Sequence, residues 1–123
     1  MELERYCVRD TFTLKEAAAV FERRKHGRVA VVVDEKDKVV GVASQGDILR
    51  ALSSGKGFYS KIKDIIQPSY LHLYERNLEK AYTIFKEKDI SLLPIINKNQ
   101  ELIDVIVTLE IYEYLEKRYG VME

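Results

Sequence analysis

A single cysteine, a net charge of zero and the lack of any long apolar run exclude several classes of protein. Cys7 has no second cysteine to pair with, and its place between Tyr6 and Val8 in a strand-like segment predicts a small buried residue in a reducing compartment. With 20 basic and 20 acidic residues, the summed charge offers nucleic acid no general attraction. No stretch approaches the ~18 apolar residues of a membrane helix, and the start MELERY lacks a signal-like apolar segment. We therefore expect a cytoplasmic protein that binds neither nucleic acid nor a membrane.

Common catalytic and metal-binding motifs are also missing. The sequence has no GxSxG, P-loop or GxGxxG motif, and no serine or cysteine has an obvious neighbouring base. His26 and His72 lie in different predicted elements, without cysteine or carboxylate partners at metal-ligand spacing. We therefore expect no enzyme, no metal and no required cofactor. An enzyme with an unrecognised site stays as an alternative, because a fold alone never excludes chemistry.

A repeat spans the chain. Three apolar residues recur 64 positions later: Leu14, Ala17 and Phe21 match Leu78, Ala81 and Phe85. Further on the offset is 63, so that Asp47-Ile48 matches Glu110-Ile111. A one-residue deletion between a helix and the following strand explains the change. The chain therefore contains two copies of one structural unit.

The order of apolar periods predicts the unit. Thr13 with Glu16 forms a capping-box pattern before a helix. A β-branched run at 29–33 and an apolar run at 39–43, separated by a charged turn, predict two antiparallel strands. Apolar residues at helical spacing predict a second helix over 45–52. With the segment around Cys7, the unit is strand, helix, strand, strand, helix.

The second copy repeats this order. The predicted elements are a short strand at 71–74, a helix at 78–88, strands at 92–96 and 102–107, and a helix at 109–119. We place repeat one at about 1–53, a linker at about 54–60, and repeat two at about 61–123, beginning with a short helix at 61–66. Because a unit of this size buries too little surface alone, the two should pack sheet against sheet in one domain over 1–123. The fold class is α/β (α+β), with two β-α-β-β-α repeats related by a pseudo-two-fold axis.

The segments VVVDEKDKVVGVASQGDIL and ISLLPIIN resemble the cystathionine β-synthase (CBS) domain, and two such domains in tandem resemble a Bateman module. The resemblance covers nearly the whole chain. It implies a regulatory module that binds an adenosine-containing ligand between its repeats and modulates an enzyme or channel. Fold analogy alone is weak evidence of function, so the residues themselves must supply the chemistry.

The residues Ser44 to Asp47 offer that chemistry at a predicted helix start. The carboxylate of Asp47 matches the two hydroxyls of a ribose, while the Ser44 hydroxyl and the N–H groups of Gln45 and Gly46 suit a phosphate at the positive end of the helix. Gly46 allows close approach. The same four residues are also an ordinary helix cap, and the two roles are compatible. The resemblance implies that the opposite repeat holds the base, through Tyr70, Leu71, Ile90, Ser91 and Leu92.

The second copy departs from this motif at three positions: Asp104 replaces Gly41, Val107 replaces Ser44 and Glu110 replaces Asp47. Asp104 brings a like charge towards a phosphate, and Val107 has no hydroxyl. We therefore expect a second, degenerate cleft with Arg28, Val29, Thr108 and Glu110, in which Arg28 pairs with Glu110 or is solvated. One nucleotide site per chain follows.

The leading hypothesis is a regulatory adenine nucleotide sensor. AMP is favoured over ADP and ATP, because one serine and no obvious arginine address the phosphate end of the first cleft. The alternatives are an S-adenosylmethionine sensor and a CBS scaffold that binds no ligand and only dimerises or docks. We expect a homodimer that acts in trans on an unidentified regulated protein. The candidate dimer contacts are Ile48, Leu52, Ile111 and Leu115.

Overall fold

The computed structural model describes residues 2–23, 28–66 and 69–120, which form two similar halves. The first half contains η1 (Glu2–Tyr6), β1 (Cys7–Arg9), α1 (Leu14–Arg23), β2 (Val29–Val33), β3 (Val39–Ser44) and α2 (Gln45–Ser53). After the short 3-10 helix η2 (Ile62–Asp64), the second half contains α3 (Leu78–Glu87), β4 (Leu92–Ile96), β5 (Leu102–Val107) and α4 (Thr108–Tyr119). The starts of α1 and α3 are 64 residues apart and those of β2 and β4 are 63 apart, in agreement with the predicted one-residue deletion between helix and strand.

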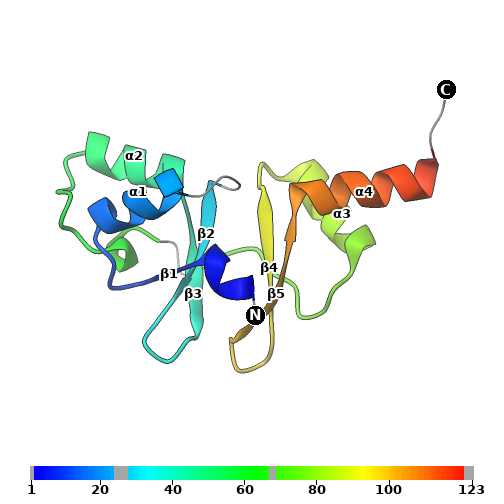
Figure 1. Ribbon diagram of the computed structural model, residues 1–123, viewed down its shortest axis with the longest axis horizontal. Coiled ribbons are helices and arrows are strands. Elements are labelled where there is room, and N and C mark those ends of the chain that lie inside the picture. The colour runs from blue at the N-terminus through cyan, green and yellow to red at the C-terminus, as the bar shows by residue number, and fades with distance from the viewer. Residues whose placement is uncertain (1, 24–27, 67–68, 121–123) are drawn as a thin grey trace.

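Each half folds into a small sheet with its helices on the outer side, and the two sheets face each other (Figure 1). In the first sheet, β2 lies between a parallel β1 and an antiparallel β3. The second sheet pairs β4 with an antiparallel β5. The predicted fold class is therefore confirmed.

The strand predicted at 71–74 is reduced to a single bridge between Leu73 and Ile95. The Leu73 N–H donates to the Pro94 carbonyl at 3.0 Å, and the Ile96 N–H donates to the Leu73 carbonyl at 2.9 Å. The next rung of this parallel ladder needs an N–H at position 94 to reach the Leu71 carbonyl, and proline has none. Pro94 therefore ends the ladder in the second repeat. In the first repeat the equivalent residue is Val31, which has an N–H, and β1 pairs with β2 there.

Three apolar clusters stabilise the chain, one inside each half and one between them. The pleat of β2 turns Ala30 and Val32 towards the helices of the first half, and Val31 and Val33 towards the other sheet. There they join a central cluster whose other buried members are Val39, Leu92, Ile96 and Val105. Because this cluster draws on both halves, neither sheet buries its inner face alone.

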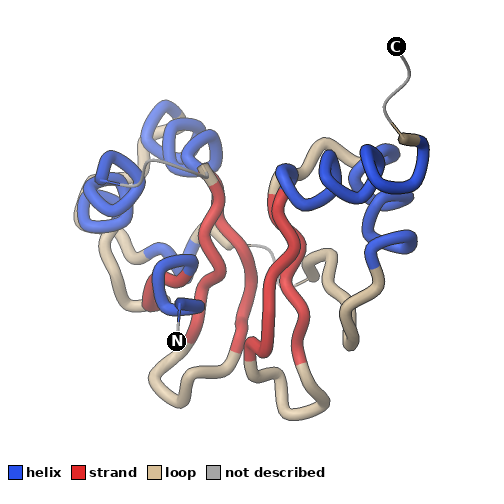
Figure 2. Tube along the Cα trace, turned by 45° about the vertical axis from the view of Figure 1, so that its right-hand side comes forward, coloured by secondary structure: helices blue, strands red, loops and turns tan. Residues whose placement is uncertain are grey.

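The two hairpins lie side by side at one end of the sheets (Figure 2). The Val39 N–H donates to the Gln100 carbonyl at 2.7 Å, and Lys38 bridges to Glu101. Asp37 and Gln100 occupy equivalent turn positions with φ of 62° and 65°, so both turns need a left-handed residue. These backbone contacts join the repeats at the end opposite Ser44 and Val107, which close β3 and β5.

The segment around η2 packs on the first repeat. Ser60 and Phe58 accept hydrogen bonds from the N–H groups of Leu14 and Lys15 at 2.9 and 3.0 Å, and Ile62 is fully buried in the first repeat's core. The helix predicted at 61–66 is thus a single 3-10 turn. The repeat boundary placed at about residue 61 remains a prediction.

Candidate functional site

The first cleft motif lies where β3 ends and α2 begins. The Asp47 N–H donates to Ser44 Oγ at 3.0 Å, and the Ser44 N–H donates to Asp47 Oδ2 at 2.8 Å. This reciprocal capping box satisfies two N–H groups at the start of α2. The hydroxyl and the carboxylate are therefore held together, in the capping role that the sequence analysis weighed beside the ligand role.

Arg50 completes this group of side chains. Its Nη2 lies 2.6 Å from Asp47 Oδ1, and a Cβ added at Gly46 would lie 3.3 Å from its Nη1, so the guanidinium lies across the glycine. The sequence analysis found no arginine for the first cleft and missed this residue. The signal was an acid and an arginine three positions apart on one helix, which places them side by side.

The N–H groups at the helix start are only partly available. The Gln45 N–H donates to the Arg28 carbonyl at 2.8 Å, so it already has a partner. The prediction that this group is free for a phosphate is wrong, because the antiparallel register pairs Val29 with Ser44 and brings Arg28 beside Gln45. Gly46 lies next to the Ser44 hydroxyl: a Cβ added at Gly46 would be 3.7 Å from Ser44 Oγ.

The residues predicted to hold the base occupy several environments. Tyr70 and Leu92 pack in the central cluster between the sheets, Ile90 packs in the second repeat's own core, and Leu71 is exposed. The Ser91 carbonyl accepts a hydrogen bond from the Thr108 hydroxyl at 3.3 Å. Their role in binding a base therefore remains a prediction.

An arginine occupies the second cleft motif. Arg76 Nη1 lies 3.1 Å from Asp104 Oδ2 and 3.3 Å from the Val105 carbonyl, while Nη2 donates to Glu110 Oε2. Glu110 also accepts from the Val107 N–H at 3.2 Å, and its hydrogen bond raises the pKa of Arg76. The sequence analysis expected Arg28 to pair with Glu110 or to be solvated, whereas the structure pairs Glu110 with Arg76. The spacing of residues along the chain does not predict this contact, because only the fold brings Arg76 and Glu110 together.

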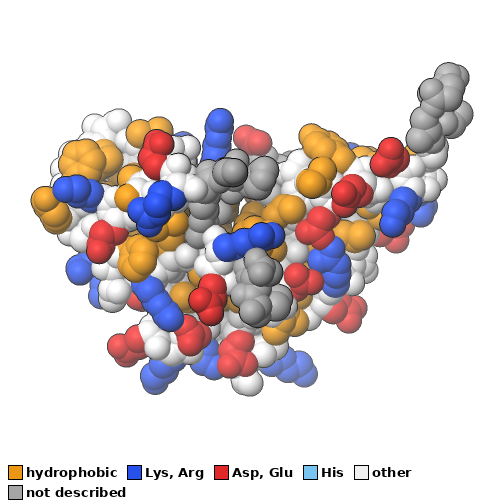
Figure 3. All heavy atoms as spheres, in the orientation of Figure 1, with side chains coloured by type: hydrophobic (Ala, Val, Ile, Leu, Met, Phe, Trp, Pro, Cys, Tyr) orange, Lys and Arg blue, Asp and Glu red, His pale blue; other side chains and the backbone are white. Residues whose placement is uncertain are grey.

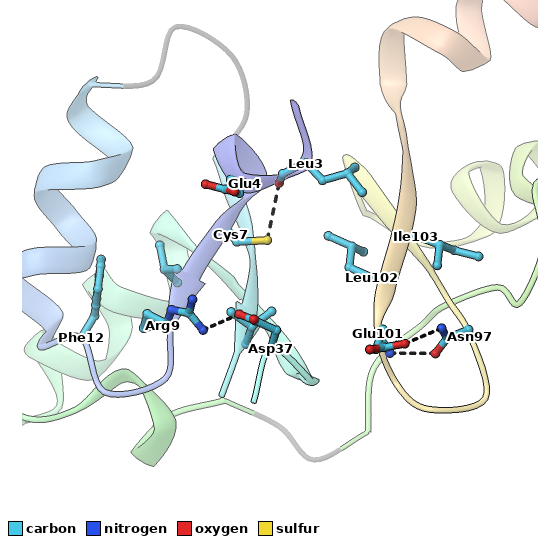
Figure 4. A pocket seen from close by; sticks show the side chains of 12 residues that line it. Leu3, Glu4, Cys7, Arg9, Phe12, Asp37, Asn97, Glu101, Leu102 and Ile103 are labelled. Carbon is cyan, nitrogen blue, oxygen red and sulfur yellow. Dashed lines mark hydrogen bonds and ion pairs between the residues drawn. The ribbon is translucent and has the colours of Figure 1, made fainter. Parts of the chain in front are cut away.

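A cavity of about 530 Å³ opens between the repeats near the hairpins (Figure 4). Leu3 and Cys7 of the first repeat face Leu102 of the second across it. Cys7 is half-buried, and its Sγ lies 3.5 Å from the Leu3 carbonyl. Three of the charged residues that line it have partners within the chain: Arg9 pairs with Asp37 at 2.6 Å, and Glu101 accepts a hydrogen bond from Asn97 at 2.8 Å. None of the predicted site residues lines this cavity.

Comparison with known proteins identifies the fold. Residues 3–54 match the CBS domain family. The CBS domains of a transcriptional regulator from Streptococcus pneumoniae superpose with a TM-score of 0.75 and 20% identity, over 89% of each chain. The first repeat matches the CBS family, and the whole chain has the fold of a CBS domain pair.

Other structures share the fold of this CBS pair. One is the cytosolic domain of the Mg²⁺ channel MgtE in complex with ATP, with a TM-score of 0.71 and 20% identity over 90% of this chain and 45% of that one. Another is a Methanocaldococcus jannaschii protein proposed as an archaeal homolog of g-AMPK, with a TM-score of 0.80 and 22% identity over 91% of this chain and 46% of that one.

Curated relatives contain the CBS pair as one part of a longer chain. The CBS pair is 32% identical over 108 residues to a homoserine O-acetyltransferase from Methanosphaera stadtmanae, of which it covers 21%. Across three curated relatives it spans from 21% to 50% of their length. The acetyltransferase name thus applies to a protein most of which lies outside the match.

Two further properties bear on the site. Within residues 2–23, 28–66 and 69–120, no helix is long and apolar enough to cross a membrane. The same ranges contain no group of three or more histidine, cysteine and acidic side chains that could hold a metal ion. His26, considered as a ligand in the sequence analysis, lies outside the described residues. Acidic and basic side chains intermingle on the face shown in Figure 3.

Proposed function

We propose that this CBS pair is a regulatory module that binds an adenine nucleotide at the start of α2 and modulates a partner protein. One observation carries the proposal: the Ser44 hydroxyl, the Asp47 carboxylate and the Arg50 guanidinium meet at one helix N-terminus. A nucleotide needs an acceptor for its ribose hydroxyls and donors for its phosphate. This group contains both kinds.

Binding would exchange the partners of Asp47. The Arg50 side chain is 74% exposed and that of Asp47 is 40% exposed, and exposed ion pairs contribute only about 0–1 kcal/mol. The ribose hydroxyls can therefore replace Arg50 as donors to Asp47 Oδ1 with little loss of free energy, while Oδ2 still accepts a hydrogen bond from the Ser44 N–H. The released guanidinium is then placed to bind the phosphate.

The choice of AMP rests on charge. One arginine and one serine hydroxyl suit a single phosphate group, whereas ADP and ATP bring further negative charge towards Asp47. The ATP complex of the MgtE domain and the proposed g-AMPK homolog support an adenine nucleotide by analogy of fold. They do not rank the nucleotides for this chain.

Calorimetric titration tests the proposal. AMP, ADP, ATP and S-adenosylmethionine are each titrated into the purified protein, and the best ligand is repeated with Asp47→Asn, which keeps an acceptor for the cap but removes the charge. We expect about tenfold weaker binding, because a hydrogen bond to a charged group loses its charge. Glu110→Gln, the matched change in the second cleft, should leave the affinity unchanged.

The stoichiometry should be one nucleotide per chain, because Arg76 occupies the second motif. Saturation at two equivalent nucleotides would contradict a single site. Tightest binding by S-adenosylmethionine would replace the nucleotide with that ligand. The lack of heat with all four ligands, from a folded protein without co-purified ligand, would favour the scaffold that only dimerises or docks.

Regulation in trans would use a homodimer formed through the helices. Ile48 and Ile111 are buried in the cores of their own repeats, so the prediction that they contact a partner chain is wrong. Leu49, Leu109 and Tyr112 present exposed apolar surface on α2 and α4 instead. Sedimentation at tens of micromolar tests the dimer, and a monomer would contradict it.

A further inference from the structure

A second cavity between the repeats has a chemistry of its own. It measures about 400 Å³, within the size range of small-molecule sites. Val39 and Val40 at the start of β3 and Ile96 at the end of β4 line it. Since Ser44 closes the other end of β3, this cavity lies towards the hairpins.

Three aromatic rings from one segment line the cavity. Tyr70, His72 and Tyr74 alternate along an extended stretch, and alternation turns side chains to the same side. The ring centroids of Tyr70 and His72 lie 5.1 Å apart at 48°, and those of His72 and Tyr74 lie 5.1 Å apart at 87°. Such tilted and edge-on pairs leave ring faces and edges on which a further flat ring can pack.

Among the residues that the structure describes, no charged side chain lines this cavity, which distinguishes it from its counterpart across the pseudo-two-fold axis. The larger cavity contains Asp37 where this one has Gln100, and also carries Glu4, Arg9 and Glu101. A charged ligand would therefore lose water here without gaining an opposite charge, which is unfavourable. An uncharged ligand meets no such cost.

Hydrogen-bonding groups are nevertheless present. His72 Nδ1 lies 3.0 Å from the Tyr70 carbonyl, and because a carbonyl only accepts, this contact requires the proton on Nδ1. In the neutral ring Nε2 is then an acceptor. Ser69 and Gln100, which carry polar side chains, also line the cavity. Burial, with a smaller effect of Tyr74, raises the pKa of Tyr70, so its hydroxyl stays neutral at physiological pH.

We propose that this cavity binds an uncharged, flat aromatic or heteroaromatic compound that carries an N–H or O–H donor for His72 Nε2. The ring would pack among Tyr70, His72 and Tyr74, against the apolar wall of Val39 and Val40. The residues from Ser44 to Asp47 do not line the cavity, so this binding does not require them, but it shares Tyr70 with the residues predicted to hold the base of the nucleotide. A ligand held there contacts both repeats and stabilises their packing.

Indole is a suitable probe, because it is neutral, flat and carries one N–H donor. We would titrate it into the ¹⁵N-labelled full chain and follow the backbone amide signals by NMR. Saturable shifts should cluster at Val40, His72 and Gln100. Shifts confined to other regions, or no saturable shift up to millimolar indole, would overturn the proposal.

A matched pair of tyrosine variants tests the location. Tyr74 and Tyr112 are 63% and 64% exposed, so neither replacement by alanine should disturb folding. Tyr74→Ala should weaken indole binding about three- to tenfold, since it removes an aromatic contact, and Tyr112→Ala on α4 should not change it. Equal effects of the two variants would contradict the site.

Two further ligands test the chemistry. The 1-methylindole molecule has no N–H, so it should bind the native protein more weakly than indole does. To His72→Phe, which keeps a ring but loses the acceptor, 1-methylindole and indole should bind equally well. Equal affinities for the native protein would contradict the hydrogen bond to His72. Tighter binding of tetramethylammonium than of indole would reveal an aromatic cage for cations and overturn the uncharged class.

Discussion

Arg76 donates a hydrogen bond to Glu110 across 34 positions of the chain, and its other terminal nitrogen binds Asp104. Asp104 and Glu110 occupy the positions that hold Gly41 and Asp47 in the first repeat. Asp104 adds a carboxylate that the first motif lacks, and one arginine from the loop before α3 binds both acids of the second motif. Each motif contains an arginine bound to its acid, but Arg76 binds two carboxylates and a backbone carbonyl, whereas Arg50 binds the one carboxylate of Asp47. This difference favours a ligand site in the first repeat.

Replacing Arg76 with alanine should reduce the free energy of unfolding by about 1–2 kcal/mol, because it removes charge-assisted hydrogen bonds and leaves two nearby carboxylates without their cation. Urea unfolding followed by circular dichroism measures the change. The double variant Arg76→Ala/Glu110→Gln should recover part of the loss. An unchanged stability in Arg76→Ala would show that the network is only a surface contact.

Replacing Arg50 with alanine should separate the two ends of the nucleotide. AMP should bind about three- to tenfold more weakly without the guanidinium, whereas adenosine, which lacks the phosphate, should bind at least as well because Asp47 Oδ1 loses its competing partner. Calorimetry with both ligands tests this. Equal weakening of AMP and adenosine would contradict the exchange of partners at Asp47.

The capping box at α1 should be visible as a shifted titration. The Thr13 N–H donates to Glu16 Oε1 at 2.8 Å, and this hydrogen bond, with that of the Thr13 side chain, lowers the pKa of Glu16. A lowered pKa in the folded state stabilises the fold above the unfolded-state pKa, and this contribution is lost as the pH falls through the folded-state value. NMR titration of the Glu16 carboxylate should therefore show a pKa below that of an unperturbed glutamate. In Thr13→Ala it should return towards the ordinary value.

Ile62 should contribute as much to stability as a core residue of a strand. Its side chain is fully buried in the first repeat's core, so Ile62→Ala should cost about 2–5 kcal/mol through lost burial and a residual cavity. Ile103→Ala, at a position 46% exposed, is the matched control and should cost much less. Chemical unfolding of both variants gives the comparison. Similar small losses would place the η2 segment outside the cooperative core.

Most of the fold was predictable, because each element carries a local signal. The β-branched run at 29–33 and the apolar run at 39–43 predict β2 and β3, and Thr13 with Glu16 predicts the start of α1. The prediction of a strand at 71–74 was wrong because the pairing of this segment depends on Pro94 in β4, far from it in the sequence. An alternating segment predicts a strand, but only its neighbour decides whether the hydrogen bonds exist.

The same division holds at the site. The sequence by itself determined the repeat, the helix starts and the residues Ser44 and Asp47, because spacing along a helix or strand fixes such features locally. Only the tertiary structure decided that Arg28 satisfies Gln45, that Arg76 neutralises Glu110, and that Tyr70, His72 and Tyr74 line a cavity with Val39. These contacts join residues of separate elements, and the packing of the two sheets, which no local pattern encodes, brings them together.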